Sequence, residues 1–211
     1  SWQEDPFYVL STAALIILGG LGFLVLYNLS AFKFWRRNRR TRGRITLHTR
    51  IVVATTILFL LAGTALFLAT EWRTAFAGMP LAKKLSTAFF TSVTTRTAGF
   101  NVVPMADLSV GGRFLTIPLM FIGAGPGSTA GGIKVTTFVV LVLTIVAMLR
   151  GRGETDFRIR TIPVAVVREA TVIFILGIFT VALFFGLLLA TESPLPGTDM
   201  TDRLLFEAAS A

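Results

Sequence analysis

The sequence predicts an all-α integral membrane protein in which a unit of long helix, short helix and long helix repeats. Hydrophobic residues make up 54% of the 211 residues and charged residues only 15%. The mean hydropathy is +0.75, which is typical of membrane proteins. Several uncharged stretches are long enough to cross a bilayer, and a segment between two of them is too short to do so.

Composition limits the chemistry that the chain can perform. The sequence contains no cysteine and a single histidine, His48, so disulfides and thiolate metal sites are excluded. No cluster of metal ligands and no pairing of nucleophile and base can be found in the sequence. We therefore predict that the chain is not an enzyme and carries no cofactor.

The net charge of +9 is concentrated in two linkers, residues 33–50 and 150–168. Both linkers are rich in arginine, and apolar helices flank both of them. This is the positive-inside pattern, so we predict that both linkers are cytoplasmic. The same distribution argues against nucleic acid as a partner.

Residues 1–46 are predicted to hold the closing helix of one unit and the first basic linker. Phe7–Phe32 is a run of 26 residues without a charge. A spanning helix needs about 20 apolar residues. The sequence therefore predicts one transmembrane helix over about 7–32.

Residues 47–150 are predicted to form one complete unit. Ile51–Thr70 can span the bilayer, whereas Leu85–Thr95 supplies only eleven uncharged residues before a glycine turn breaks the helix. A short helix over about 84–96 would therefore enter the membrane and return. Such a segment survives only where protein or an aqueous cavity covers its backbone, and its carbonyls can then replace the water around a cation.

The second long helix of this unit is predicted to be broken. Residues 114–149 carry a single charge, at Lys134, and as one helix would measure about 54 Å against a bilayer core of about 30 Å. Five glycines and a proline crowd residues 123–132, where a helix cannot continue cheaply. A phosphate-binding loop is an alternative, but Ile133 disrupts the required spacing; a passive kink is another.

Residues 151–211 are predicted to hold the second linker, a long helix over about 166–191 and the start of another short helix. Leu68–Glu71 is echoed by Leu189–Glu192, 121 positions later. Phe206–Ala211 then matches Phe89–Thr94, so the pattern is an internal repeat. A central pore would need about four units, and we therefore expect a longer polypeptide.

The quoted motifs resemble the Trk/Ktr/HKT superfamily of potassium transporters. Residues 92–101, SVTTRTAGFN, resemble the third filter segment, and residues 125–134, GPGSTAGGIK, resemble the intramembrane loop of bacterial Trk and Ktr pore subunits. Residues 18–23 resemble the closing helix of the second repeat. Residues 205–211 resemble the start of the fourth pore helix.

This resemblance implies a pseudo-fourfold, potassium-channel-like pore that takes up K⁺ across the bacterial inner membrane. It also implies a homodimer and a cytoplasmic nucleotide-binding regulatory subunit. K⁺ would then be the transported ion rather than a cofactor. The alternative is a secondary transporter with discontinuous helices.

The resemblance assigns a selectivity filter to residues 97–101. K⁺ would meet the carbonyls of Thr97, Ala98 and Gly99, with Phe100 and Asn101 completing the filter. Glycine suits a filter because one position needs a backbone conformation that a Cβ disfavours. A glycine turn between two interfacial helices is the alternative interpretation.

The resemblance also assigns a gate to the loop 123–134, which would form a flexible constriction below the filter. Its predicted residues are Gly123, Gly125, Pro126, Gly127, Ser128, Thr129, Gly131, Gly132 and Lys134. The two hydroxyls and the loop carbonyls could meet ions or water. Lys134 is expected to act at the gate or to pair with a carboxylate elsewhere, because intramembrane charge is functional by default.

Arg96 lies beside the predicted filter, where a cation facing the pore would repel K⁺. We therefore expect its side chain to point away and to brace the filter through a salt bridge to Glu207 on the next short helix. The alternative is an arginine that snorkels at the outer interface.

Overall fold

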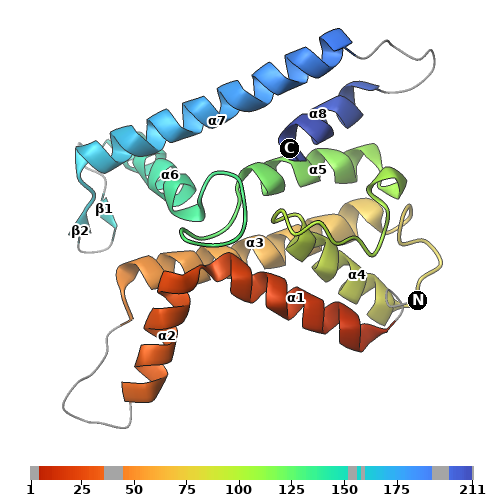
Figure 1. Ribbon diagram of the computed structural model, residues 1–211, viewed down its shortest axis with the longest axis horizontal. Coiled ribbons are helices and arrows are strands. Elements are labelled where there is room, and N and C mark those ends of the chain that lie inside the picture. The colour runs from red at the N-terminus through yellow and green to blue at the C-terminus, as the bar shows by residue number, and fades with distance from the viewer. Residues whose placement is uncertain (1–4, 36–44, 152–155, 158–159, 192–199, 211) are drawn as a thin grey trace.

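The computed structural model describes residues 5–35, 45–151, 156–157, 160–191 and 200–210. Most of the described chain is helical (Figure 1). The helices are α1 (Pro6–Leu21), α2 (Phe23–Trp35), α3 (Leu47–Glu71), α4 (Leu81–Thr94), α5 (Val110–Phe121), α6 (Val135–Leu149), α7 (Val164–Thr191) and α8 (Met200–Ser210). A 3₁₀ turn covers Met105–Asp107, and two-residue strands β1 (Asp156–Phe157) and β2 (Arg160–Thr161) pair antiparallel in the second linker.

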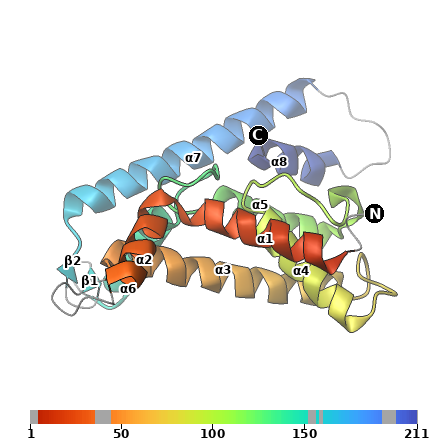
Figure 2. The same ribbon diagram turned by 60° about the horizontal axis from the view of Figure 1, so that its bottom comes forward.

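The helix ends that flank the two linkers lie at one end of the molecule. The end of α2, the start of α3, the end of α6 and the start of α7 share that end (Figures 1 and 2). The starts of α1, α4 and α8 lie at the opposite end, with the end of α3. The prediction that both linkers lie on one side of the membrane requires such an arrangement. Many of the linker arginines lie outside the described residues.

Two described helices, α3 and α7, are single spans by length and composition, and α1 with α2 would make a third if the bent pair is one span. After Arg168 and Glu169 near its start, the sequence of α7 is uncharged, and its hydrophobic side chains are largely exposed in this chain. A helix that is apolar on every side belongs in lipid or against other apolar helices. The described helices therefore fit a membrane protein.

The short helix α4 packs tightly against α3. Their contact includes Gly63, where an added Cβ would lie 2.3 Å from Ser92 Oγ. Ser92 Oγ donates to Leu60 O on α3 at 3.1 Å. Small residues and hydrogen bonds of this kind hold helices together in membranes, where lipid is as apolar as the side chains. Val9, Phe90 and Val93 extend the same buried cluster to α1.

The stretch expected as a single helix over 7–32 is divided at Gly22. Gly22 has φ +82, and α1 and α2 are bent by 95° at this break. An added Cβ on Gly22 would lie 2.3 Å from Pro126 O. The bend therefore makes room for the glycine-rich loop, which comes from a segment about a hundred residues later in the sequence.

The stretch 114–149 is broken as the sequence predicts. α5 ends at Phe121 and α6 begins at Val135, and between them the chain crosses itself. Ile122 and Ile133 form an isolated parallel bridge, with Ile133 N–H donating to Phe121 O at 2.8 Å. The loop is thus closed at its base by a backbone contact.

Candidate functional site

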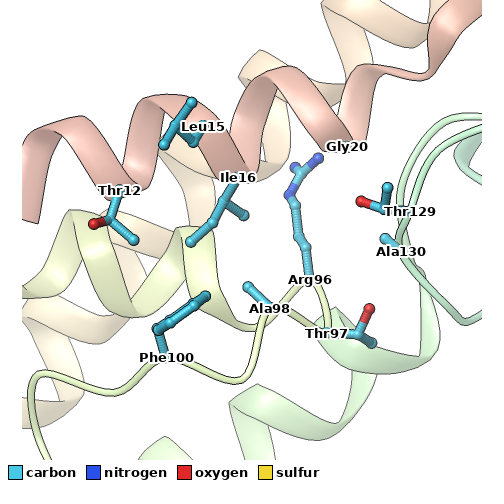
Figure 3. A pocket seen from close by; sticks show the side chains of 10 residues that line it. All are labelled: Thr12, Leu15, Ile16, Gly20, Arg96, Thr97, Ala98, Phe100, Thr129 and Ala130. Atoms are coloured by element: carbon cyan, nitrogen blue, oxygen red, sulfur yellow. The ribbon is translucent and has the colours of Figure 1, made fainter.

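A cavity of about 530 Å³ lies where α1, the segment after α4 and the glycine-rich loop meet. Figure 3 shows the side chains around it. Its lining residues are Thr12, Leu15, Ile16, Gly20, Arg96, Thr97, Ala98, Phe100, Thr129 and Ala130. The structure therefore brings residues of the predicted filter and of the predicted gate to one cavity, together with α1, for which sequence reasoning predicted no such role.

The turn after α4 carries the predicted filter. Ala98 N–H donates to Thr94 O at 3.2 Å, and Thr94 Oγ1 donates to Phe100 O. These two bonds fold the chain back on the end of α4, and Gly99 takes φ +76 at the turn. Nothing lies within 4 Å of a Cβ built on Gly99, so a glycine is required here by backbone conformation rather than by space.

Arg96 points away from the turn and lies buried, with 6% of its surface exposed. Its guanidinium Nη2 donates to Thr56 O on α3 at 3.1 Å, and Figure 3 shows the side chain reaching toward Gly20 on α1. Arg96 thus has a partner inside its own unit. Burial also argues against the interfacial snorkelling alternative.

Glu207 lies exposed on α8, which packs against α5 and α7. The expected salt bridge between Arg96 and Glu207 is not seen in the part of the chain that the structure describes, where the contact of Arg96 is a carbonyl of α3. The pairing stays a prediction for the assembled protein.

The glycine-rich loop is held by backbone hydrogen bonds to α1 and α2. Gly125 N–H donates to Gly20 O at 2.9 Å, and Phe23 N–H donates to Gly127 O at 3.2 Å. A weaker bond of 3.4 Å runs from Thr129 N–H to Gly19 O. These bonds satisfy backbone groups that a bilayer could not.

Three glycines of the loop are packed against backbone atoms. A Cβ would lie 1.8 Å from Gly131 O if added to Gly123, 2.6 Å from Leu21 O if added to Gly125, and 2.7 Å from Met120 O if added to Gly132. Gly132 also has φ +72. Glycine at these positions therefore permits a close crossing of chains, which the sequence alone did not reveal.

The polar groups of the loop are few. Lys134 Nζ donates to Ala130 O at 2.7 Å, which ties the two ends of the last loop turn together. Ser128 Oγ is buried without a hydrogen-bond partner among the described residues. Thr129 is exposed and lines the cavity. The loop therefore offers a hydroxyl and carbonyls to water or an ion.

Glu71 is a buried residue whose part in the structure the sequence analysis missed. It is fully buried at the end of α3, where Thr74 Oγ1 donates to Oε2 at 2.6 Å and Ser109 N–H donates to the same oxygen at 3.2 Å. Ser109 also caps α5, so Glu71 fixes the return of the chain from the turn into α5. Its place in the repeated LATE sequence was the available signal.

Comparisons with known proteins identify the family. The chain matches the TrkH family, described as "Cation transport protein", over residues 1–211. It is 35% identical to the potassium/sodium uptake protein NtpJ of Enterococcus hirae, over 99% of this chain and 45% of that protein. It is 33% identical to Ktr system potassium uptake protein B of Bacillus subtilis, over 100% of this chain and 45% of that protein.

The fold agrees with a solved structure. The potassium transporter TrkH from Vibrio parahaemolyticus aligns with a TM-score of 0.63 at 17% identity, over 98% of this chain and 50% of that chain. This confirms the predicted all-α membrane fold. The chain spans about half the length of the relatives it matches. On the match over its whole length, the chain belongs to the TrkH family of cation transport proteins, which are transporters and not enzymes.

Proposed function

We propose that these residues form part of the ion pathway of a potassium uptake protein in the bacterial inner membrane. The observation that supports this most is the shared cavity, which joins the turn 97–101 to the loop 123–134 beside α1. K⁺ would meet backbone carbonyls of Thr97, Ala98 and Gly99, because carbonyl oxygens can replace the hydration shell of a cation.

The loop 123–134 would act as the gate of this pathway. It lies on the route from the turn toward the end of the molecule that holds the linkers (Figure 1), and Thr129 and Ala130 line the cavity. Arg96 lines one wall of the same cavity, and it would support the turn by holding it against α3 through its bond to Thr56 O. The names of the matched relatives, one for potassium/sodium uptake and one for potassium uptake, support K⁺ as the proposed ion.

A substitution of Gly99 tests this proposal. Gly99→Ser forces a side chain into a φ of +76 at the proposed filter, and Gly78→Ser does the same at φ +75 in the loop before α4. A built Cβ meets nothing within 4 Å at either glycine. The two variants are therefore matched in backbone conformation and in the free space around the added side chain. They differ in that only Gly99 lies in the proposed filter.

We expect Gly99→Ser to weaken the preference for K⁺ over Na⁺, and Gly78→Ser to leave it unchanged. The measurement is uptake of each ion into liposomes that contain the full-length protein carrying this chain. Equal selectivity in wild type and Gly99→Ser would remove Gly99 from the filter and contradict the proposal.

A coupled carrier is the competing function, because discontinuous helices such as α1–α2 and α5–α6 also occur in secondary transporters. The same liposomes separate the two mechanisms. We expect flux without obligatory proton movement. Uptake that requires a proton or sodium gradient would identify a carrier instead.

The linkers 33–50 and 150–168 would face the cytoplasm and meet a nucleotide-binding regulatory subunit or anionic lipid. The protein would assemble as a homodimer. The word "system" in the name of the matched Bacillus subtilis protein supports a partner subunit. Native mass spectrometry of the full-length protein should detect two copies, and a monomer would contradict the dimer.

A further inference from the structure

Thr97 has an unusual backbone conformation at the junction of the proposed filter and gate. Its φ is +60, and among the described residues it is the one non-glycine with a positive φ. A β-branched side chain rarely adopts this left-handed region. Such conformations persist only where surrounding contacts maintain them, so the contacts of Thr97 indicate what holds it.

The side chain of Thr97 is bonded to the glycine-rich loop. Gly131 N–H donates to Thr97 Oγ1 at 2.9 Å across 34 residues of sequence. A Cβ built on Gly131 would find only Thr97 atoms within 4 Å, at 3.8 and 3.9 Å. At Gly131 the loop therefore approaches the turn through Thr97.

The bond is placed where it can be made and broken. Thr97 and Gly131 are both exposed, and Thr97 lines the cavity. A neutral hydrogen bond at an exposed site contributes little net stability. The loop side is itself fixed by Lys134 Nζ, which donates to Ala130 O, next to Gly131. Movement of this loop turn would release the Thr97 hydroxyl.

We propose that Thr97 is a positioning residue whose hydroxyl couples the filter to the loop. This rests on the proposed function of both segments. While Gly131 holds the hydroxyl, Thr97 keeps φ +60 and its carbonyl keeps one direction. When the loop moves, Thr97 relaxes toward an ordinary conformation and that carbonyl turns. Coupling is reciprocal, so K⁺ in the filter also favours one loop position.

The test uses the full-length protein in liposomes with a reporter on the loop. The described chain has no native cysteine, so Thr129→Cys adds a thiol at an exposed loop position. Any cysteine elsewhere in the full-length protein is first replaced. The rate of modification by a water-soluble maleimide is then measured in KCl and in NaCl, and K⁺/Na⁺ selectivity is measured in parallel.

Three substitutions separate the hydroxyl from the shape of the side chain. Thr97→Val keeps the β-branch and removes the acceptor, whereas Thr97→Ser keeps the hydroxyl. Thr95→Val is the control for loss of a hydroxyl in the same segment, because Thr95 Oγ1 bonds Ser92 O at the end of α4 at 2.8 Å. If Thr97→Val does not insert in the membrane, Thr97→Ala takes its place.

We expect Thr97→Val to raise the modification rate about two- to tenfold, the population change that one neutral hydrogen bond produces. The difference between the modification rates in KCl and in NaCl should disappear in this variant. Thr97→Ser and Thr95→Val should keep that difference. Equal behaviour of Thr97→Val and wild type, or loss of the K⁺ effect in Thr97→Ser, would overturn the coupling.

The selectivity measurement distinguishes the two levels of failure. Suppose that Gly99→Ser changes selectivity, while Thr97→Val keeps the difference in loop modification rate between KCl and NaCl. The proposed filter is then supported and the coupling is wrong. If Gly99→Ser changes nothing, the proposed function itself fails, and the coupling fails with it.

Discussion

The turn 97–101 and the loop 123–134 both depend on glycine, but in different ways. At Gly99 a side chain would have open space and a disfavoured backbone angle. At Gly123 a side chain would collide with the backbone of Gly131. Glycine therefore sets a backbone direction in the first segment and a distance between chains in the second. Composition alone cannot separate these uses.

The same contrast extends to what holds each segment. The turn rests on side-chain hydroxyls and a buried arginine, with Thr94 bonded to Phe100 O and Arg96 bonded to Thr56 O. The loop rests mainly on backbone bonds to α1 and α2. Substitutions should therefore act on the turn through lost side-chain groups, and on the loop chiefly through added bulk.

Removing the loop is expected to have the largest effect. Deletion of Gly125–Gly131 takes away the proposed constriction and leaves the Ile133–Phe121 bond at its base. Ion flux into liposomes should rise at least about tenfold, which corresponds to about 1.4 kcal/mol less barrier. Unchanged or lower flux, in protein that still elutes as a folded species on size-exclusion chromatography, would show that the loop does not obstruct the pathway.

Gly123→Ala tests the close crossing of chains. The added Cβ would lie 1.8 Å from Gly131 O, and because this is backbone the loop has to move. We expect the free energy of unfolding to fall by more than about 3 kcal/mol, which exceeds the usual cost of overpacking. The measurement is the thermal midpoint of the purified protein, which should be lower. Gly186→Ala on α7 is the control, since its Cβ meets nothing within 4 Å. Equal midpoints for the two variants would contradict tight packing at Gly123.

Glu71→Gln tests the buried carboxylate that joins α3 to α5. The amide keeps the shape but places a donor against Thr74 or Ser109, which already donate to Glu71. We expect the free energy of unfolding to decrease by about 1–3 kcal/mol, measured from the same thermal midpoint. Glu169→Gln on the exposed side of α7 should change little. An unchanged thermal midpoint for Glu71→Gln would mean that the charge has no part in holding the start of α5.

Arg96→Gln and Glu207→Gln test the predicted pairing behind the turn. If the two charges meet in the assembled protein, the double variant should be less damaging than the sum of the single ones, by about 0.5–3 kcal/mol. Stability and uptake are both measured. Strict additivity would leave the bond to Thr56 O as the contact that matters for Arg96.

The sequence predicted those parts of the fold that depend on length and charge. A bilayer of fixed thickness makes 114–149 too long for one helix, so the break between α5 and α6 could be placed at the glycines. The same reasoning identified α4 as too short to span. Both features follow from counting uncharged residues between charges.

The bend at Gly22 and the role of Glu71 could not be predicted in this way. Gly22 lies in an uninterrupted apolar run, and its bend depends on Pro126, which is distant in the sequence. The burial of Glu71 depends on Ser109, which lies 38 residues later in the sequence. Contacts between remote segments leave no local pattern, and the candidate cavity with its α1 wall is built from such contacts.

The 95° bend between α1 and α2 has a consequence for how this region tolerates change. The bonds that join it to the loop use N–H and C=O groups, at Gly20, Phe23 and their partners. Replacing a side chain by alanine leaves those backbone groups in place. A conventional alanine scan of α1 would therefore not detect these bonds, except at glycines, where alanine adds a side chain. The joint could therefore persist while the surrounding sequence diverges, and replacing single amides by esters would reveal it.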